Sequence, residues 1–212
     1  MLFVFDWDGT LCDSLAKIVR SLQTAAAMAG ESPLPAARAQ QIIGLALPVA
    51  VERLFPCAGD HQQARIADYY RQAFAAESTP APLFAGVEET LLELRARGHR
   101  LAVATGKARF GLDRSLAAVG LENFFCTTRC ADETASKPNP QMLHEIMCEL
   151  GFAAEDSVMV GDTTFDLEMA SAASMPSLAV TFGSHGREEL QECRPLRLLD
   201  SIPELLHWES GK

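Results

Sequence analysis

The sequence predicts an α/β protein in which a parallel β-sheet, flanked by helices, carries an all-helical insert. Short apolar runs recur along the chain, and each ends in a small or charged residue that is followed by a helical segment. The stretch between the first two runs is far longer than the roughly 30 residues that a strand-helix-strand unit needs. At 212 residues, the chain is long enough for one full α/β core and a smaller helical unit.

The strands are predicted from apolar runs that do not alternate with polar residues, a pattern typical of strands buried on both faces of a parallel sheet. They cover residues 2–5, 101–104, 124–128, 158–160 and 178–181, with a short edge strand over 196–199. The carboxyl ends of parallel strands meet at one edge, where open α/β sheets bind ligands. Residues that follow these runs are therefore expected to gather there.

The helices are predicted from apolar residues at helical spacing between prolines and glycines, which end helices. In the insert they cover residues 16–28, 37–43, 48–55 and 62–76. After the insert they cover residues 87–97, 110–119, 140–150 and 163–173, with a last helical turn over 202–208.

Two aspartates follow the first predicted strand directly. Asp6 and Asp8 are two positions apart, so their side chains point the same way in an extended chain, and Gly9 and Thr10 then turn it. Two neighbouring carboxylates repel each other, and a bound cation is the obvious compensation. One acid can then attack a substrate while the other handles protons. An acidic turn without chemistry is the alternative for this motif alone.

The later strands also end in polar residues. They are Thr105 and Gly106 after the second strand, Lys137 after the third, and Asp162 and Asp166 after the fourth. With Asp6 and Asp8, this ordered set resembles the four motifs of the haloacid dehalogenase-like hydrolase superfamily, and residues 136–189 resemble its phosphoglycolate phosphatase-type subfamily. The resemblance covers essentially the whole chain. It implies a Rossmann-like core over residues 1–13 and 82–212, with a helical cap domain over residues 14–81.

The resemblance also implies catalytic roles. Asp6 would be the nucleophile that forms an aspartyl-phosphate, and Asp8 would protonate the leaving alcohol and then activate water. Asp6, the Asp8 carbonyl and Asp162 would hold Mg²⁺. Asp166 would join this metal site by orienting a bound water. An acid favoured by the helix dipole at a helix start is the alternative for Asp166.

Phosphate binding is expected from the remaining motif residues. Thr105 would donate its hydroxyl, Gly106 its backbone N–H, and Lys137 would steady both the nucleophile and the transferred phosphoryl group. Family members often carry Asn where this chain has Gly106, which removes a side-chain contact but keeps the backbone donor. The full expected set of substrate- and phosphate-binding residues is Gly9, Thr10, Gly44, Thr105, Gly106 and Lys137.

Residues that would select the substrate are less defined. Residues 43–47 resemble the family's specificity loop. The apolar character of this segment indicates a small or weakly polar leaving group, but packing inside the cap explains it equally well. Arg20, Arg38 or Arg53 could bind a substrate carboxylate, although each is more often a solvated helix residue. Lys107 is also expected to be solvated.

Composition limits the possible partners. The net charge of −10 argues against a nucleic-acid surface, but a metal and one lysine can still hold an anionic substrate. No apolar stretch is long enough to span a membrane, and the first strand leaves no room for a signal peptide, so we expect a cytoplasmic protein.

The six cysteines are expected to be reduced and mostly structural thiols, with Cys12 partly exposed. His185 is also expected to be structural.

The sequence therefore predicts a Mg²⁺-dependent phosphatase that acts on a small phosphorylated metabolite. Asp8 favours phosphoryl chemistry, because the dehalogenases lack an acid at that position. By family resemblance, 2-phosphoglycolate is the leading substrate, followed by pyrophosphate and sugar phosphates. A phosphomutase similar to β-phosphoglucomutase is the alternative enzyme, and a binding module that kept the fold is a third hypothesis. Nothing in the sequence indicates an oligomeric state.

Overall fold

The computed structural model of the chain describes residues 1–77 and 79–209. Its centre is a sheet of six parallel strands in the order β3-β2-β1-β4-β5-β6. The strands are β1 (Leu2–Phe5), β2 (Arg100–Thr105), β3 (Thr127–Cys130), β4 (Ser157–Gly161), β5 (Ser177–Val180) and β6 (Arg197–Leu199). The first strand thus lies between β2 and β4, where the strand order reverses and where open sheets of this kind bind ligands.

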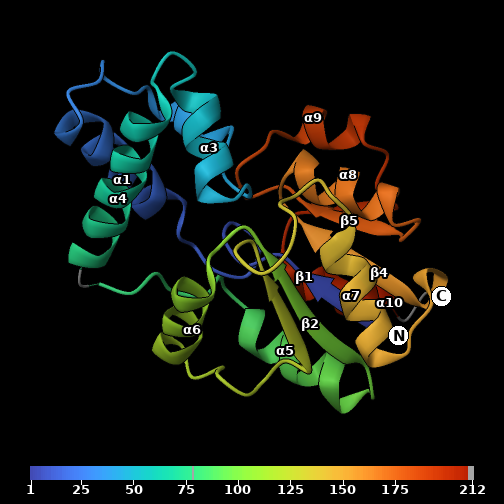
Figure 1. Cartoon of the computed structure of the whole chain (residues 1–212). Helices are drawn as coiled ribbons and strands as arrows, with labels where there is room; N and C mark the ends of the chain where they lie inside the picture. The colour runs from blue at the N-terminus through green and yellow to red at the C-terminus, as the bar shows by residue number, and fades with distance from the viewer. Residues whose placement is uncertain (78, 210–212) are drawn as a thin grey trace.

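Helices cover both faces of this sheet (Figure 1). Phe3 and Phe5 of β1 pack toward the face covered by α5 (Val87–Ala96), α6 (Arg109–Ala118) and α10 (Leu205–Glu209). Leu2 and Val4 pack toward the face covered by α7 (Gln141–Leu150) and α8 (Thr164–Ala172). This division follows from the alternation of side chains along a strand. A short helix, α9 (Arg187–Glu192), follows β5 and packs beside α8.

The insert forms a helical unit with its own apolar core. Its helices are α1 (Leu15–Met28), α2 (Ala36–Gln40), α3 (Leu47–Leu54) and α4 (Asp60–Ala76). Figure 1 shows α1, α3 and α4 together on one side of the molecule, away from most of the sheet. Leu22, Val51 and Ile66 are buried in a cluster separate from those of the sheet. Phe165 of α8 joins this cluster, so the helical unit also contacts the core.

Most predicted elements are confirmed with ends shifted by a few residues, and two predictions were wrong. The third strand begins at Thr127, because Phe124 and Phe125 pack against the apolar core ahead of it. A further helix, α9, was not predicted, because its six residues are too few to show a helical period. Within the described residues, none of the helices combines the length and the hydrophobicity that crossing a membrane requires.

The six cysteines are free thiols in the structure, and two of them, Cys12 and Cys130, are buried. The prediction that Cys12 is partly exposed was wrong, because its side chain is 0 % exposed beneath a bridge to Leu83. Burial, with the nearby Asp8 carboxylate, raises the pKa of the Cys12 thiol to about 12. The thiolate that reacts with alkylating agents is therefore scarce at neutral pH.

Candidate active site

Asp6 and Asp8 emerge at the carboxyl end of the central strand. The Asp6 N–H donates to the Val160 carbonyl at 2.9 Å, so pairing with β4 continues past β1 and fixes the backbone. The two residues are only 1 % and 7 % exposed, and both line one cavity with Thr105 and Gly106 at the end of β2. The predicted nucleophile, proton donor and phosphate-binding residues of the first two motifs are therefore brought together.

Three carboxylates and one lysine form a buried charged cluster beside this cavity. Ligand atoms of Asp6, Asp162 and Asp166 lie within 4.8 Å of one another. The Lys137 Nζ, on a side chain that is 0 % exposed, lies 2.6 Å from Asp6 Oδ1 and 2.6 Å from Asp166 Oδ1. Three carboxylates against one ammonium leave two negative charges unbalanced, and buried unpaired charge is strongly unfavourable.

The pKa values of the acids in this cluster reflect the excess of negative charge. Burial, assisted by the other two acids, raises the pKa of Asp6 well above its usual range. Burial and Asp166 raise the pKa of Asp162 to about 7. Burial alone would lower the pKa of Lys137, but Asp166 and Asp6 hold it above its usual value, so this lysine is a permanent cation.

The donor set fits a hard divalent cation. Within the part of the chain that the structure describes, Asp6 Oδ2 is buried without a hydrogen-bond partner, and Asp166 Oδ1 faces Lys137 without an aligned hydrogen bond. Carboxylate oxygens are the ligands that Mg²⁺ prefers, and a divalent ion would balance the two excess negative charges. Among the described residues, this is the one group of three or more potential ligands that lies close enough to share an ion.

Asp162 is held in place from several sides. Its oxygens accept from the Thr10 hydroxyl at 2.8 Å and from the Ser184 N–H at 2.7 Å. A Cβ at Gly9 would lie 2.3 Å from Asp162 Oδ2, and a Cβ at Gly183 would lie 2.2 Å from Asp162 Cβ, so only glycine fits at either position. Gly9 and Thr10, which were expected to bind phosphate, both contact Asp162 in the structure and help to position it.

Asp166 stands at the start of α8, as one of its two sequence interpretations expected, and it also contacts Lys137. Its Oδ2 accepts from the Thr163 N–H at 3.1 Å and from the Thr163 hydroxyl at 2.7 Å, which completes a capping box at the start of α8. Its Oδ1 faces Lys137. The same side chain therefore begins a helix and orients the buried lysine.

Asp8 carries an ion pair that the sequence did not reveal. The Lys107 Nζ lies 2.8 Å from both Asp8 carboxylate oxygens, and the Ser14 hydroxyl donates to one of them. The prediction that Lys107 is solvated was wrong, because its side chain, only 10 % exposed, turns back from the loop before α6 toward this carboxylate. The pair fixes the Asp8 carboxylate at the cavity wall.

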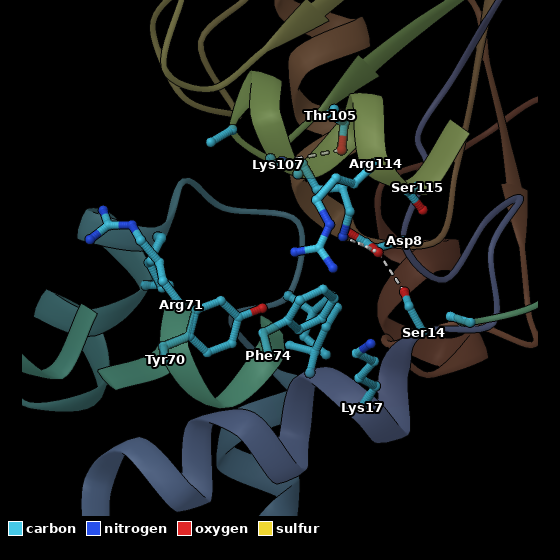
Figure 2. A pocket seen from close by; sticks show the side chains of 18 of the residues that line it. Asp8, Ser14, Lys17, Tyr70, Arg71, Phe74, Thr105, Lys107, Arg114 and Ser115 are labelled. Carbon is cyan, nitrogen blue, oxygen red and sulfur yellow. Dashed lines mark hydrogen bonds and ion pairs between the residues drawn. The ribbon is translucent and has the colours of Figure 1, made fainter. Parts of the chain in front are cut away.

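The cavity has a volume of about 410 Å³ and lies between the sheet edge and the helical unit. Apolar side chains make up most of the wall from α1 and α4; they include Ile18, Leu22 and Phe74. Figure 2 shows Tyr70 and Lys17 of the helical unit and Arg114 of α6 directed toward the region of Asp8. No motif pointed to Tyr70 or Arg114.

The three arginines considered from the sequence do not line this cavity. Arg20 pairs with Glu77 at 2.7 Å. Arg38 donates to the Leu54 carbonyl at 3.1 Å, and the guanidinium of Arg53 stacks 5.2 Å from the ring centre of Phe165. Each of them instead has a local partner on or near the helical unit, which agrees with the alternative that they are ordinary helix residues.

The segment between α2 and α3 closes over the sheet edge. The Ala46 N–H donates to the Ser136 hydroxyl at 3.0 Å, which ties this segment to the core. Gly44, with φ +100°, lines the cavity, and a Cβ at Gly106 would lie only 2.4 Å from its carbonyl oxygen. The glycine at position 106 therefore allows the two backbones to meet.

His185 has the structural role expected from the sequence. Its side chain is buried, and its Nδ1 accepts from the Thr164 N–H at 3.1 Å, at the start of α8. The imidazole ring also packs edge-on against Phe165, with ring centres 5.3 Å apart. It thereby links the loop after β5 to the first turn of α8.

Comparisons with known proteins agree with this arrangement. A family model described as haloacid dehalogenase-like hydrolase matches residues 3–180. A relative from Dickeya dadantii, named probable phosphatase IndB, is 35% identical, with 97% of this chain and 91% of the relative covered. A phosphoglycolate phosphatase of Agrobacterium fabrum is 34% identical, with 86% and 81% covered. The solved structure of a hydrolase from Pseudomonas syringae shares the fold, with a TM-score of 0.91, 22% identity, and 100% and 98% covered.

Proposed function

The chain belongs to the haloacid dehalogenase-like hydrolase family, and on that premise we propose that it is a Mg²⁺-dependent phosphatase of small phosphomonoesters. The observation that carries the proposal is the buried cluster of Asp6, Asp162, Asp166 and Lys137 at the end of β1, beside a cavity lined by Asp8. The names of the two curated relatives, a probable phosphatase and a phosphoglycolate phosphatase, support it. We also propose that residues 14–81 form a cap domain on a core of residues 1–13 and 82–212.

The proposed reaction has two steps. A carboxylate oxygen of Asp6 attacks phosphorus, the bond from phosphorus to the leaving oxygen breaks, and Asp8 gives that oxygen its proton. Asp8 then takes a proton from a water molecule that attacks the aspartyl-phosphate, which releases inorganic phosphate and restores Asp6. The Thr105 hydroxyl and the Gly106 N–H bind phosphate oxygens, and Lys137 balances the charge of the nucleophile.

Mg²⁺ is the proposed cofactor, with Asp6, the Asp8 carbonyl and Asp162 as its protein ligands. When bound, this ion screens the negative phosphate from the attacking carboxylate. Asp166 contributes charge and orients Lys137, because its other oxygen is engaged at the start of α8.

Mg²⁺ is expected to raise the thermal stability of the protein. At a concentration 100 times its dissociation constant, a ligand of the folded state adds about 2.7 kcal/mol. For a chain of this size, about 1 kcal/mol shifts the midpoint by roughly 2–4 °C, so the expected rise is roughly 5–11 °C. The measurement is a thermal melt with and without Mg²⁺, repeated on Asp162→Asn, which should lose most of the rise. An equal rise in both proteins would place the ion elsewhere.

Gly106→Ala is expected to lower kcat/KM for a phosphomonoester. The added Cβ would meet the Gly44 carbonyl at 2.4 Å and push residues 43–47 off the sheet edge. Overpacking of this kind costs about 1–3 kcal/mol, which corresponds to roughly 5- to 150-fold in rate. Gly59→Ala is the matched control, because a Cβ there meets no atom within 4 Å. Unchanged kinetics in Gly106→Ala would mean that this close approach plays no part in turnover.

The leading substrate is 2-phosphoglycolate, because a relative carries that activity in its name. The test is phosphate release with Mg²⁺ from 2-phosphoglycolate, pyrophosphate, sugar phosphates and nucleotides. One strongly preferred compound is expected. Transfer of phosphate between two positions of one sugar, without free phosphate, would identify a phosphomutase instead, and no reaction with any compound would contradict the phosphatase proposal.

A further inference from the structure

Four cationic side chains line the cavity, and within the described residues two of them, Lys17 and Arg114, form no ion pair with an acid. The Lys107 ammonium is paired with Asp8. The Lys17 Nζ donates to the backbone carbonyls of Glu77 and Thr79, at 2.8 and 3.2 Å. Arg114 forms no ion pair or hydrogen bond within the described part of the chain, and its guanidinium rests 5.7 Å from the ring centre of Phe110.

These two charges enter the cavity from opposite walls, Lys17 from α1 of the helical unit and Arg114 from α6 of the core. Figure 2 shows the Arg114 guanidinium between Lys107 and the aromatic pair Tyr70 and Phe74, with the Lys17 side chain also directed toward Asp8. Burial lowers the pKa of Lys17, Glu77 opposes this, and Arg114 lowers it further, so the two cations repel each other. An anion placed between them would relieve this repulsion.

Tyr70 adds a neutral donor to the same region. Its hydroxyl points into the cavity in Figure 2. Burial, with the Asp8 carboxylate, raises the pKa of the phenol, so the group keeps its proton at neutral pH. A guanidinium, an ammonium and a phenol provide hydrogen-bond donors suited to a carboxylate or phosphate oxygen.

We propose that Arg114, Lys17 and Tyr70 form a subsite that binds a second anionic group, carried by the leaving group of the phosphomonoester. The inference rests on the proposed function, because it assigns the phosphoryl group to Asp6 and the second anion to Arg114. The planar fork of a guanidinium matches the two oxygens of a carboxylate. The volume of about 410 Å³ and the apolar walls leave room for a leaving group larger than glycolate.

The test uses pairs of substrates that differ only in charge. They are 2-phosphoglycolate with its neutral amide, and 4-carboxyphenyl phosphate with 4-carbamoylphenyl phosphate. The wild-type protein should have a kcat/KM about tenfold higher for the charged member of each pair, since a charge-assisted hydrogen bond at a partly exposed site contributes about 1.5 kcal/mol. Arg114→Gln should remove this preference through KM, and Arg114→Lys should restore part of it.

Arg71→Gln is the matched control. Arg71 also lines the cavity, but its guanidinium pairs with Asp68 at 2.6 Å and is directed away from Asp8 in Figure 2. This variant should keep the full preference for the charged substrates. A wild-type protein without that preference, or an equal loss in the Arg71 and Arg114 variants, would overturn the subsite.

Binding separates a failure of the subsite from a failure of the phosphatase proposal. Calorimetric titration of the Asp6→Asn variant with the two aryl phosphates needs no turnover. The carboxylate should bind about tenfold more tightly than the carbamoyl compound, and the double variant Asp6→Asn/Arg114→Gln should bind both equally. Equal binding to the single variant would overturn the subsite. Tighter carboxylate binding without wild-type hydrolysis of any substrate would instead overturn only the proposed function. The same titration with a bisphosphate, in which a second phosphate replaces the carboxylate, shows which of the two anions the subsite binds more tightly.

Discussion

Asp6→Asn is expected to lower kcat for phosphate release by on the order of 10⁴-fold or more, the scale seen when a catalytic nucleophile is removed. The amide cannot form an aspartyl-phosphate. The change is nearly isosteric, and the Asp6 backbone stays fixed by its hydrogen bond to Val160, so the fold should persist. The measurement is steady-state phosphate release with Mg²⁺, alongside a thermal melt of each protein.

Asp13→Asn is the matched control for this change. Asp13 lies seven residues further along the same loop and is exposed to solvent, so the same substitution there should leave the rate unchanged. A folded Asp6→Asn protein that releases phosphate within tenfold of the wild-type rate would contradict the role of Asp6 as nucleophile.

Lys137→Met is expected to lower the free energy of unfolding by about 3–5 kcal/mol and to abolish turnover. Methionine fills a similar volume, but it leaves Asp6, Asp162 and Asp166 buried without their cation. Breaking a buried ion pair from one side has a cost of this size, because the remaining charge is uncompensated. The measurement is denaturant unfolding at neutral pH in metal-free buffer.

A double variant separates charge from packing at this position. Adding Asp166→Asn to Lys137→Met removes one of the three carboxylates, so it should recover part of the lost stability without recovering turnover. Residues in one ion-pair network are expected to be coupled in this way. If Lys137→Met unfolds at the wild-type denaturant concentration, or if the second change only adds to the loss, the electrostatic account of the cluster is incorrect.

The buried centre of the site could be predicted because its position is local in sequence. Asp6, Thr105 and Asp162 each end or follow an apolar strand. Parallel strands bring their carboxyl ends to one edge of the sheet, independently of how the helices pack. Lys137 sits in the loop after the third strand and is drawn to the acids by charge. The order of strands and strand exits therefore predicted that these residues gather at one edge, and the family resemblance supplied their expected roles.

The outer parts of the site depend on how the helical unit packs on the core, which no local pattern specifies. Arg114 and Tyr70 are single residues on helices, and only the packing of α4 opposite α6 turns them toward one cavity. Lys107 looked solvated because nothing in the sequence shows that its side chain folds back to Asp8. Cys12 looked exposed because the chain returning through Leu83 covers it from more than 70 residues away.

The central claim, that Asp6 becomes phosphorylated, is tested most directly by pre-steady-state hydrolysis of 4-nitrophenyl phosphate with Mg²⁺ and the Asp8→Asn variant. Nitrophenolate leaves without a proton from Asp8, so the first step proceeds, while the second lacks its general base and is slowed by about 10²–10⁴-fold. We predict a burst of about one nitrophenolate per protein chain, and none when Asp6→Asn is added. A slow linear release without a burst, unchanged by Asp6→Asn, would contradict the covalent mechanism.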